Sequence, residues 1–132
     1  MTTVLFACVH NAGRSQMAAA WFNQIADPDK ARAISAGTDP GPRVHPEVLV
    51  VMGERGLDLT DVSPVRLTEA LAQQAQWLIT MGCGDQCPFV PGARTEDWPL
   101  ADPKDRPIDE VRAIRDDIAR RVAALVDAHG WR

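Results

Sequence analysis

The N-terminal segment constrains the fold most narrowly, because it reads as a buried strand, a polar loop and a helix in direct succession. Residues 2–7 (TTVLFA) form a β-branched and aromatic apolar run, which is typical of a strand buried in a parallel sheet. The loop that follows contains Asn11 and Gly13, residue types that tolerate the positive φ of a tight turn. Ser15 is a suitable helix N-cap, and apolar residues follow it at helical spacing. This order is the opening of an α/β unit.

The rest of the chain continues the alternation of strands and helices. Three apolar runs predict strands and three amphipathic or proline-initiated segments predict helices. The predicted strands are residues 31–36, 77–81 and 95–98, and the predicted helices are 46–56, 63–75 and 107–129. We therefore expect an α/β domain that is doubly wound, with a four-stranded parallel sheet flanked by helices. Ligands bind beyond the carboxyl ends of such strands. The loops after strands 2–7 and 77–81 contain the three cysteines, and both loops would lie at that edge of the sheet.

Length and charge exclude several classes of protein. The 132 residues are the size of one domain, expected to span 1–132. With 14 basic and 18 acidic residues the net charge is −4, which argues against a nucleic-acid or anionic-membrane surface. No apolar run is long enough to span a bilayer, and the start does not resemble a signal peptide, so a cytoplasmic location is expected. Three cysteines are too few for a disulfide scaffold, which leaves reactive thiols, metal ligands or buried apolar residues.

The segment from Cys8 to Ser15 has the form Cys-x5-Arg-Ser, which predicts an oxyanion cradle. Successive backbone N–H groups and the N-terminus of the next helix would surround one tetrahedral anion, with Arg14 as a bidentate clamp. The same positive field favours the Cys8 thiolate, and Ser15 can donate a hydrogen bond to its sulfur. The expected substrate-binding residues are Val9, His10, Asn11, Ala12, Gly13, Arg14 and Ser15. The alternative is a buried cysteine at a strand end beside a solvated arginine.

Four sequence blocks together resemble the low-molecular-weight protein tyrosine phosphatase fold family, and most closely its arsenate reductase branch. They are residues 8–18 (CVHNAGRSQMA), 34–37 (ISAG), 81–88 (MGCGDQCP) and 97–103 (DWPLADP), in family order along nearly the whole chain. The resemblance implies that Cys8 is the nucleophile and Arg14 the oxyanion clamp. It also implies that Asn11 holds a left-handed turn, that Ser15 supports the thiolate and that Asp102 is the general acid. From the residues alone, Asp102 with its following proline is more typical of a turn.

No resident metal is expected. Potassium-binding relatives carry a glutamate in the first helix, whereas Ala19 and Ala20 stand here, so the potassium site is not carried over. A zinc site built on Cys83 and Cys87 is the alternative use of the cysteine pair. The three histidines show no ligand spacing with that pair.

Cys83 and Cys87 suit a reductase, because reduction of arsenate to arsenite takes two electrons that a pair of thiols can supply. The resemblance implies a cascade that begins with a Cys8–arsenic adduct. Cys83 then displaces arsenite by forming a disulfide with Cys8, and Cys87 moves the disulfide to Cys83, where a thioredoxin-like protein can reduce it. In the alternative, only Cys8 acts, a small thiol of the mycothiol or glutathione type takes the arseno group, and a glutaredoxin- or mycoredoxin-like protein completes the reaction. No tightly bound cofactor is expected, and the expected assembly is a monomer.

Two rival functions remain open from the sequence. A phosphatase would use the same cradle, although the chain has no tyrosine and Asp102-Pro103 is followed by the charged Lys104, which disfavours a pocket for aromatic esters. A non-catalytic protein that binds arsenite or a soft metal through its three thiols is the other rival. Turnover with a thiol reductant separates that protein from an enzyme.

Overall fold

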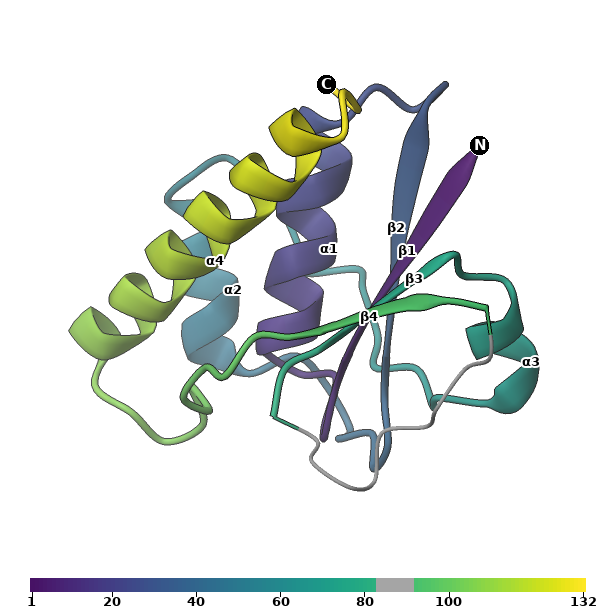
Figure 1. Cartoon of the computed structure of the whole chain (residues 1–132). Helices are drawn as coiled ribbons and strands as arrows, with labels where there is room; N and C mark the ends of the chain where they lie inside the picture. The colour runs from purple at the N-terminus through teal and green to yellow at the C-terminus, as the bar shows by residue number, and fades with distance from the viewer. Residues whose placement is uncertain (83–91) are drawn as a thin grey trace.

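The computed structural model describes residues 1–82 and 92–132, and its strands form one parallel sheet (Figure 1). In chain order the elements are β1 (Thr2–Cys8), α1 (Arg14–Ile25), β2 (Ala31–Gly37), α2 (Pro46–Gly53), α3 (Glu69–Gln73), β3 (Trp77–Thr80), β4 (Arg94–Asp97) and α4 (Ile108–Ala128). The strand order is β2-β1-β3-β4, and every neighbouring pair is parallel. The predicted α/β fold with a four-stranded parallel sheet is therefore confirmed for the described residues.

Helices cover both faces of the sheet, because successive side chains of a strand point to opposite faces. Val4, Phe6 and Cys8 of β1 belong to the larger apolar core, which α1, α2 and α4 complete. Leu5 and Ala7 belong to a smaller cluster on the other face, together with residues of α3. Figure 1 shows α1, α2 and α4 on one side of the sheet and α3 on the other. The thiol of Cys8 thus lies on the face that α1 covers.

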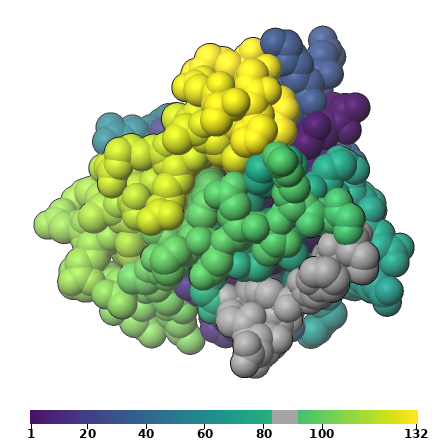
Figure 2. Space-filling view, viewed as in Figure 1, coloured from purple at the N-terminus to yellow at the C-terminus, as the bar shows by residue number. Residues whose placement is uncertain are grey.

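The edge strand β4 and the central strand β1 differ in how much of them is exposed to solvent. β4 is an edge strand whose residues are all exposed, and Figure 2 shows it on the surface beside α4. β1 is a central strand and is almost wholly buried, which agrees with its continuous apolar sequence. No helix in the described part of the chain is long and apolar enough to cross a membrane.

The predicted helix over 63–75 is wrong in its first half. Only Glu69–Gln73 is helical, and the Thr68 hydroxyl caps it by accepting from Leu71 N at 3.1 Å. The preceding residues run beside the end of β2 instead, where Gly37 N donates to Val65 O and Leu67 N donates to Gly37 O, both at 2.8 Å. The free backbone groups at the edge of β2 pair with this segment, and that tertiary pairing overrides local helical preference.

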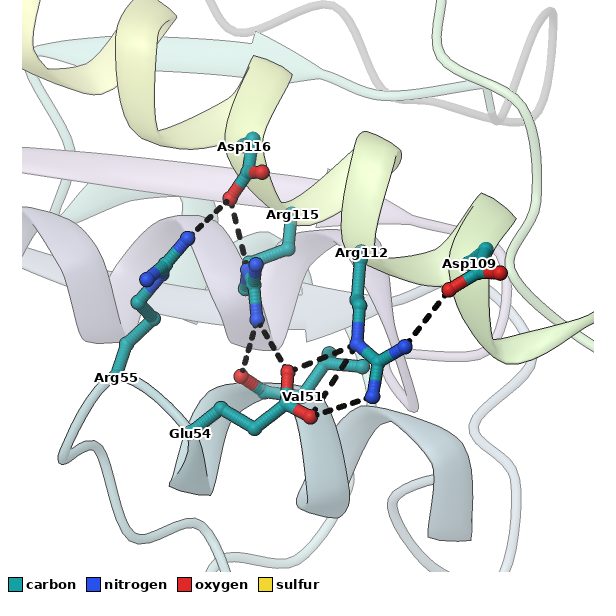
Figure 3. Close-up of polar contacts among 7 residues, drawn as sticks. All are labelled: Val51, Glu54, Arg55, Asp109, Arg112, Arg115 and Asp116. Carbon is teal, nitrogen blue, oxygen red and sulfur yellow. Dashed lines mark hydrogen bonds and ion pairs between the residues drawn. The ribbon is translucent and has the colours of Figure 1, made fainter.

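A cluster of charged side chains joins α4 to the end of α2 (Figure 3). Arg115 is 3% exposed and donates at 2.8 Å each to Val51 O, to Glu54 Oε1 and to Asp116 Oδ1. Arg112 donates hydrogen bonds to both carboxylate oxygens of Glu54, with Nη2 at 2.7 Å from Oε2. Hydrogen bonding from Arg112, with a further contribution from Arg115, lowers the pKa of Glu54 from 4.5 to about 2. The carboxylate therefore helps to fix α4 against α2 in its ionised form.

The Glu54 cluster predicts how the stability of the protein changes in acid. A carboxyl group with a lowered pKa stabilises the fold above its unfolded-state value, here 4.5, and the contribution is lost as the pH falls from there to about 2. Wild type is therefore expected to melt at a higher temperature than Glu54→Gln at about pH 6, with the gap closing toward about pH 2. Thermal melts across that range measure it. Asp61→Asn, an exposed carboxylate without an ion pair among the described residues, serves as the control. A gap that does not change with pH would contradict the role of the Glu54 charge.

Candidate active site

Cys8 is the last residue of β1 and stands at the carboxyl edge of the sheet, where the chain turns toward α1. The residue is 2% exposed, and its Sγ lies 2.9 Å from Ser15 Oγ. Asn11 adopts a φ of 49° within the turn, the left-handed conformation that asparagine tolerates. The turn packs closely against Gly37, where a Cβ would come within 2.6 Å of Val9 O. The left-handed turn at Asn11 is the one that the resemblance implies, whereas Gly13 has a negative φ of −146°.

Ser15 serves the thiol and not the helix end. The N-cap of α1 is Gly13, and no side chain caps the helix, so the prediction that Ser15 is the N-cap was wrong. The hydroxyl of Ser15 instead accepts a hydrogen bond from Asn11 Nδ2 at 2.6 Å. Since that bond occupies an acceptor site, the single hydroxyl proton of Ser15 is available for Cys8 Sγ. A hydroxyl in this position can donate to the sulfur when Cys8 acts as a nucleophile.

The loop between Cys8 and α1 is equipped to bind an anion. Within the described part of the chain, no backbone N–H of residues 10–15 donates a hydrogen bond to another residue. These N–H groups and the N-terminus of α1 are therefore available to an oxyanion. Arg14, at the start of α1, is 6% exposed, and its Nη1 donates to Leu100 O at 3.1 Å. The segment at Leu100 thus holds the guanidinium in place.

Asp102 lies beside Arg14. Its Oδ2 is 3.8 Å from Arg14 Nη2, and its side chain is 42% exposed. Lys104 N donates to Asp102 Oδ1 at 3.0 Å, which holds the carboxylate in position. Pro103 packs on the loop so closely that a Cβ on Gly13 would lie 2.7 Å from Pro103 Cγ. A carboxyl group at the open side of an anion loop is placed to exchange a proton with a bound oxyanion and with solvent.

Two residues at this site were not given a role from the sequence. His45 N donates to Ala12 O at 2.9 Å, and its ring lies near the loop at Gly13. Burial lowers the pKa of His45, and the Asp102 carboxylate partly opposes this effect. Gln16, which is 4% exposed, bonds to Asn11. Gln16 lies inside the first family-like block, whereas nothing in the local sequence marks His45.

Cys83 and Cys87 lie outside the described residues. Gly82, immediately before them, has a φ of 96° and packs on Arg14 so closely that a Cβ there would overlap the guanidinium. The strand before Gly82, β3, ends at Thr80 and lies parallel and next to β1, so the two strands end at the same edge of the sheet. The described residues contain no group of three side chains suited to hold a metal ion.

Comparisons with known proteins agree with this geometry. The model of the low molecular weight phosphotyrosine protein phosphatase family matches residues 3–129. A Halobacterium salinarum protein, provisionally named an arsenate reductase, is 37% identical over 126 residues, covering 92% of this chain and 89% of that protein. A thioredoxin-dependent arsenate reductase from Corynebacterium glutamicum superimposes with a TM-score of 0.83 at 39% identity. That alignment covers 97% of this chain and 61% of the relative, so this chain spans less than two thirds of its length. An arsenate reductase solved in its phosphate-binding state gives a TM-score of 0.84 at 28% identity, covering 97% and 98% of the two chains.

Proposed function

The chain belongs to the low molecular weight phosphotyrosine protein phosphatase family, and from its similarity to arsenate reductases we propose that it is an arsenate reductase whose nucleophile is Cys8. The observation that carries the proposal is the buried Cys8 thiol, 2.9 Å from Ser15 Oγ, at the base of a loop whose backbone N–H groups have no hydrogen-bond acceptor within residues 1–82 and 92–132. The names of the Halobacterium salinarum and Corynebacterium glutamicum relatives support arsenate as the substrate. The enzyme needs no tightly bound cofactor in this proposal.

The first step is nucleophilic attack on arsenic. The N–H groups of the loop and Arg14 bind the arsenate oxygens and stabilise the charge that develops on them. The Cys8 thiolate forms a sulfur–arsenic bond while one arsenic–oxygen bond breaks. Asp102 donates its proton to the departing hydroxyl group of arsenate, which leaves as water. Arsenic remains in its pentavalent state in this adduct.

The second and third steps transfer the electrons. The Cys83 thiolate attacks Cys8 Sγ, so a disulfide forms and the sulfur–arsenic bond breaks with its electron pair retained by arsenic. Arsenite leaves, and the two sulfur atoms are oxidised. Cys87 then attacks Cys83, which frees Cys8 and leaves a Cys83–Cys87 disulfide. A thioredoxin-like dithiol protein reduces that disulfide, and the thioredoxin dependence of the Corynebacterium glutamicum relative supports this choice.

A single turnover without external thiol tests the proposal. Fully reduced protein is mixed with arsenate, free thiols are counted, arsenite is measured and the intact mass is recorded. We expect one arsenite released per chain, a loss of two thiols and a mass lower by about two units. Peptide mapping is expected to place the final disulfide between Cys83 and Cys87.

Other outcomes identify the rival functions. If all three thiols remain and arsenite appears only after mycothiol or glutathione is added, the small-thiol route replaces the cascade. If no thiol restores arsenite formation but phosphate esters are hydrolysed, the cradle belongs to a phosphatase. Stoichiometric binding of arsenite with neither activity identifies a non-catalytic thiol protein.

A further inference from the structure

Gln16 is a buried amide that connects the anion loop to a distant segment of the chain. It lies in the first turn of α1, and its Nε2 donates to Asn11 Oδ1 at 3.0 Å. The same nitrogen lies 3.4 Å from Ser63 O, which accepts a second hydrogen bond. A buried polar side chain with two such partners costs free energy to replace by an apolar one. These bonds also affect the Cys8 thiol, because they orient the Asn11 amide that contacts Ser15.

The bonds to Asn11 determine which way its amide faces. Asn11 Oδ1 accepts from Gln16 Nε2 and also from Val65 N at 2.9 Å. A flipped amide would place the NH2 group of Asn11 against these two donors. Asn11 Nδ2 is therefore directed at Ser15 Oγ, 2.6 Å away, and the Ser15 hydroxyl that accepts this bond can donate to Cys8 Sγ when the sulfur is a thiolate.

The other end of this chain of bonds is anchored in the sheet. Val65 O accepts from Gly37 N at 2.8 Å, at the end of β2. Gly37 in turn pairs with Cys8 in the register of β1 and β2. The segment that contains Ser63 and Val65 is thus fixed to the sheet, and its backbone bonds hold the side chains of Gln16 and Asn11 in place.

We propose that Gln16 is a positioning residue for the Cys8 thiol, acting through Asn11 and Ser15. This rests on the proposed function only in taking Cys8 as the nucleophile. Without the Gln16 donor, Asn11 Oδ1 accepts from Val65 N alone, and the amide is less firmly oriented. The hydroxyl of Ser15 then points its proton at Cys8 for a smaller fraction of the time, so the thiolate is less stabilised.

The test measures the reactivity of Cys8 without arsenate. Wild type and Gln16→Met, which keeps the length of the side chain but has no donor, are alkylated with iodoacetamide over a range of pH. Peptide mass mapping reads the Cys8 rate separately from Cys83 and Cys87. In Gln16→Met we expect the pH at which the Cys8 rate reaches half of its plateau to rise by about one unit.

A matched control separates positioning from simple loss of stability. Asn23 is also on α1, and its side chain bonds to both the N–H and the carbonyl of Ala33, at 2.9 and 3.1 Å. Asn23→Leu removes two hydrogen bonds from the same helix without touching the Asn11–Ser15–Cys8 chain. It is expected to lower the melting temperature while leaving the pH profile of Cys8 alkylation in place.

The outcomes decide the inference independently of arsenate turnover. An unchanged pH profile in a folded Gln16→Met, or the same shift in Asn23→Leu, overturns the positioning role even if wild type reduces arsenate. A shift confined to the Gln16 variant supports the positioning role even if the wild-type protein does not reduce arsenate. If Gln16→Met does not fold, Gln16→Leu, which also lacks the donor to Asn11 Oδ1 and Ser63 O and adds no charge, takes its place. The same upward shift is expected there, and its absence has the same meaning.

Discussion

Cys8→Ser is expected to lower kcat for arsenate reduction by about 10⁴-fold or more. A serine hydroxyl stays protonated at neutral pH, so it is a poor nucleophile where the thiolate is a good one. Even if it bonded to arsenic, no disulfide could form and no electrons could be delivered. Turnover with arsenate and a thioredoxin system measures the loss.

The binding of the oxyanion provides the control for Cys8→Ser. The backbone N–H groups of the loop and the Arg14 guanidinium are unchanged in this variant. Arsenate or phosphate is therefore expected to raise the melting temperature of both proteins, because a ligand that binds only the folded state stabilises it. Turnover within about tenfold of wild type would contradict the assignment of Cys8 as the nucleophile.

Cys83→Ser and Cys87→Ser are each expected to lower multiple-turnover reduction by about 100-fold or more, but to stop at different species. Each thiol acts within the molecule, so its loss removes an advantage that a thiol from solution does not replace at ordinary concentration. Cys83→Ser is expected to stop at the Cys8–arsenic adduct without releasing arsenite. Cys87→Ser is expected to release one arsenite per chain and to accumulate the Cys8–Cys83 disulfide.

Mass spectrometry of the quenched reactions distinguishes these species. Because the two variants differ from each other only in which thiol is missing, each controls for the other. If both variants turn over at the wild-type rate with mycothiol or glutathione, the pair has no part in the reaction. If Cys87→Ser accumulates no Cys8–Cys83 disulfide, the order of attack is wrong.

The elements predicted from the sequence succeed where a local pattern decides the structure. Residues 2–7 became β1 with one further residue, and the long helix predicted over 107–129 is α4, Ile108–Ala128. Both patterns are continuous, and burial against the rest of the core reinforces them. The start of the helix predicted at Ser63 failed, because the backbone of that segment pairs with Gly37 at the edge of β2.

In the candidate site too, the features set by local sequence were predicted and those set by tertiary contacts were not. The anion loop was predictable, because Cys8, Asn11 and Arg14 lie close together in the chain and a strand and a helix hold its ends. The role of Ser15 as an N-cap was predicted wrongly, because α1 begins one residue earlier, at Arg14, and the Ser15 hydroxyl contacts Cys8 Sγ instead. Only the surroundings of that hydroxyl select between the two roles.

The sequence by itself determined the strand–loop–helix opening and the spacing of Cys8 and Arg14, because covalent connection keeps such short segments together in any compact state. Tertiary structure alone decided which distant groups meet that loop. Arg14 reaches Leu100 and Asp102 because the chain after β4 crosses the carboxyl edge of the sheet, and Gln16 reaches Ser63 because the edge of β2 is paired there. Contacts of this kind depend on the free energy of the whole packed sheet, which no local pattern contains.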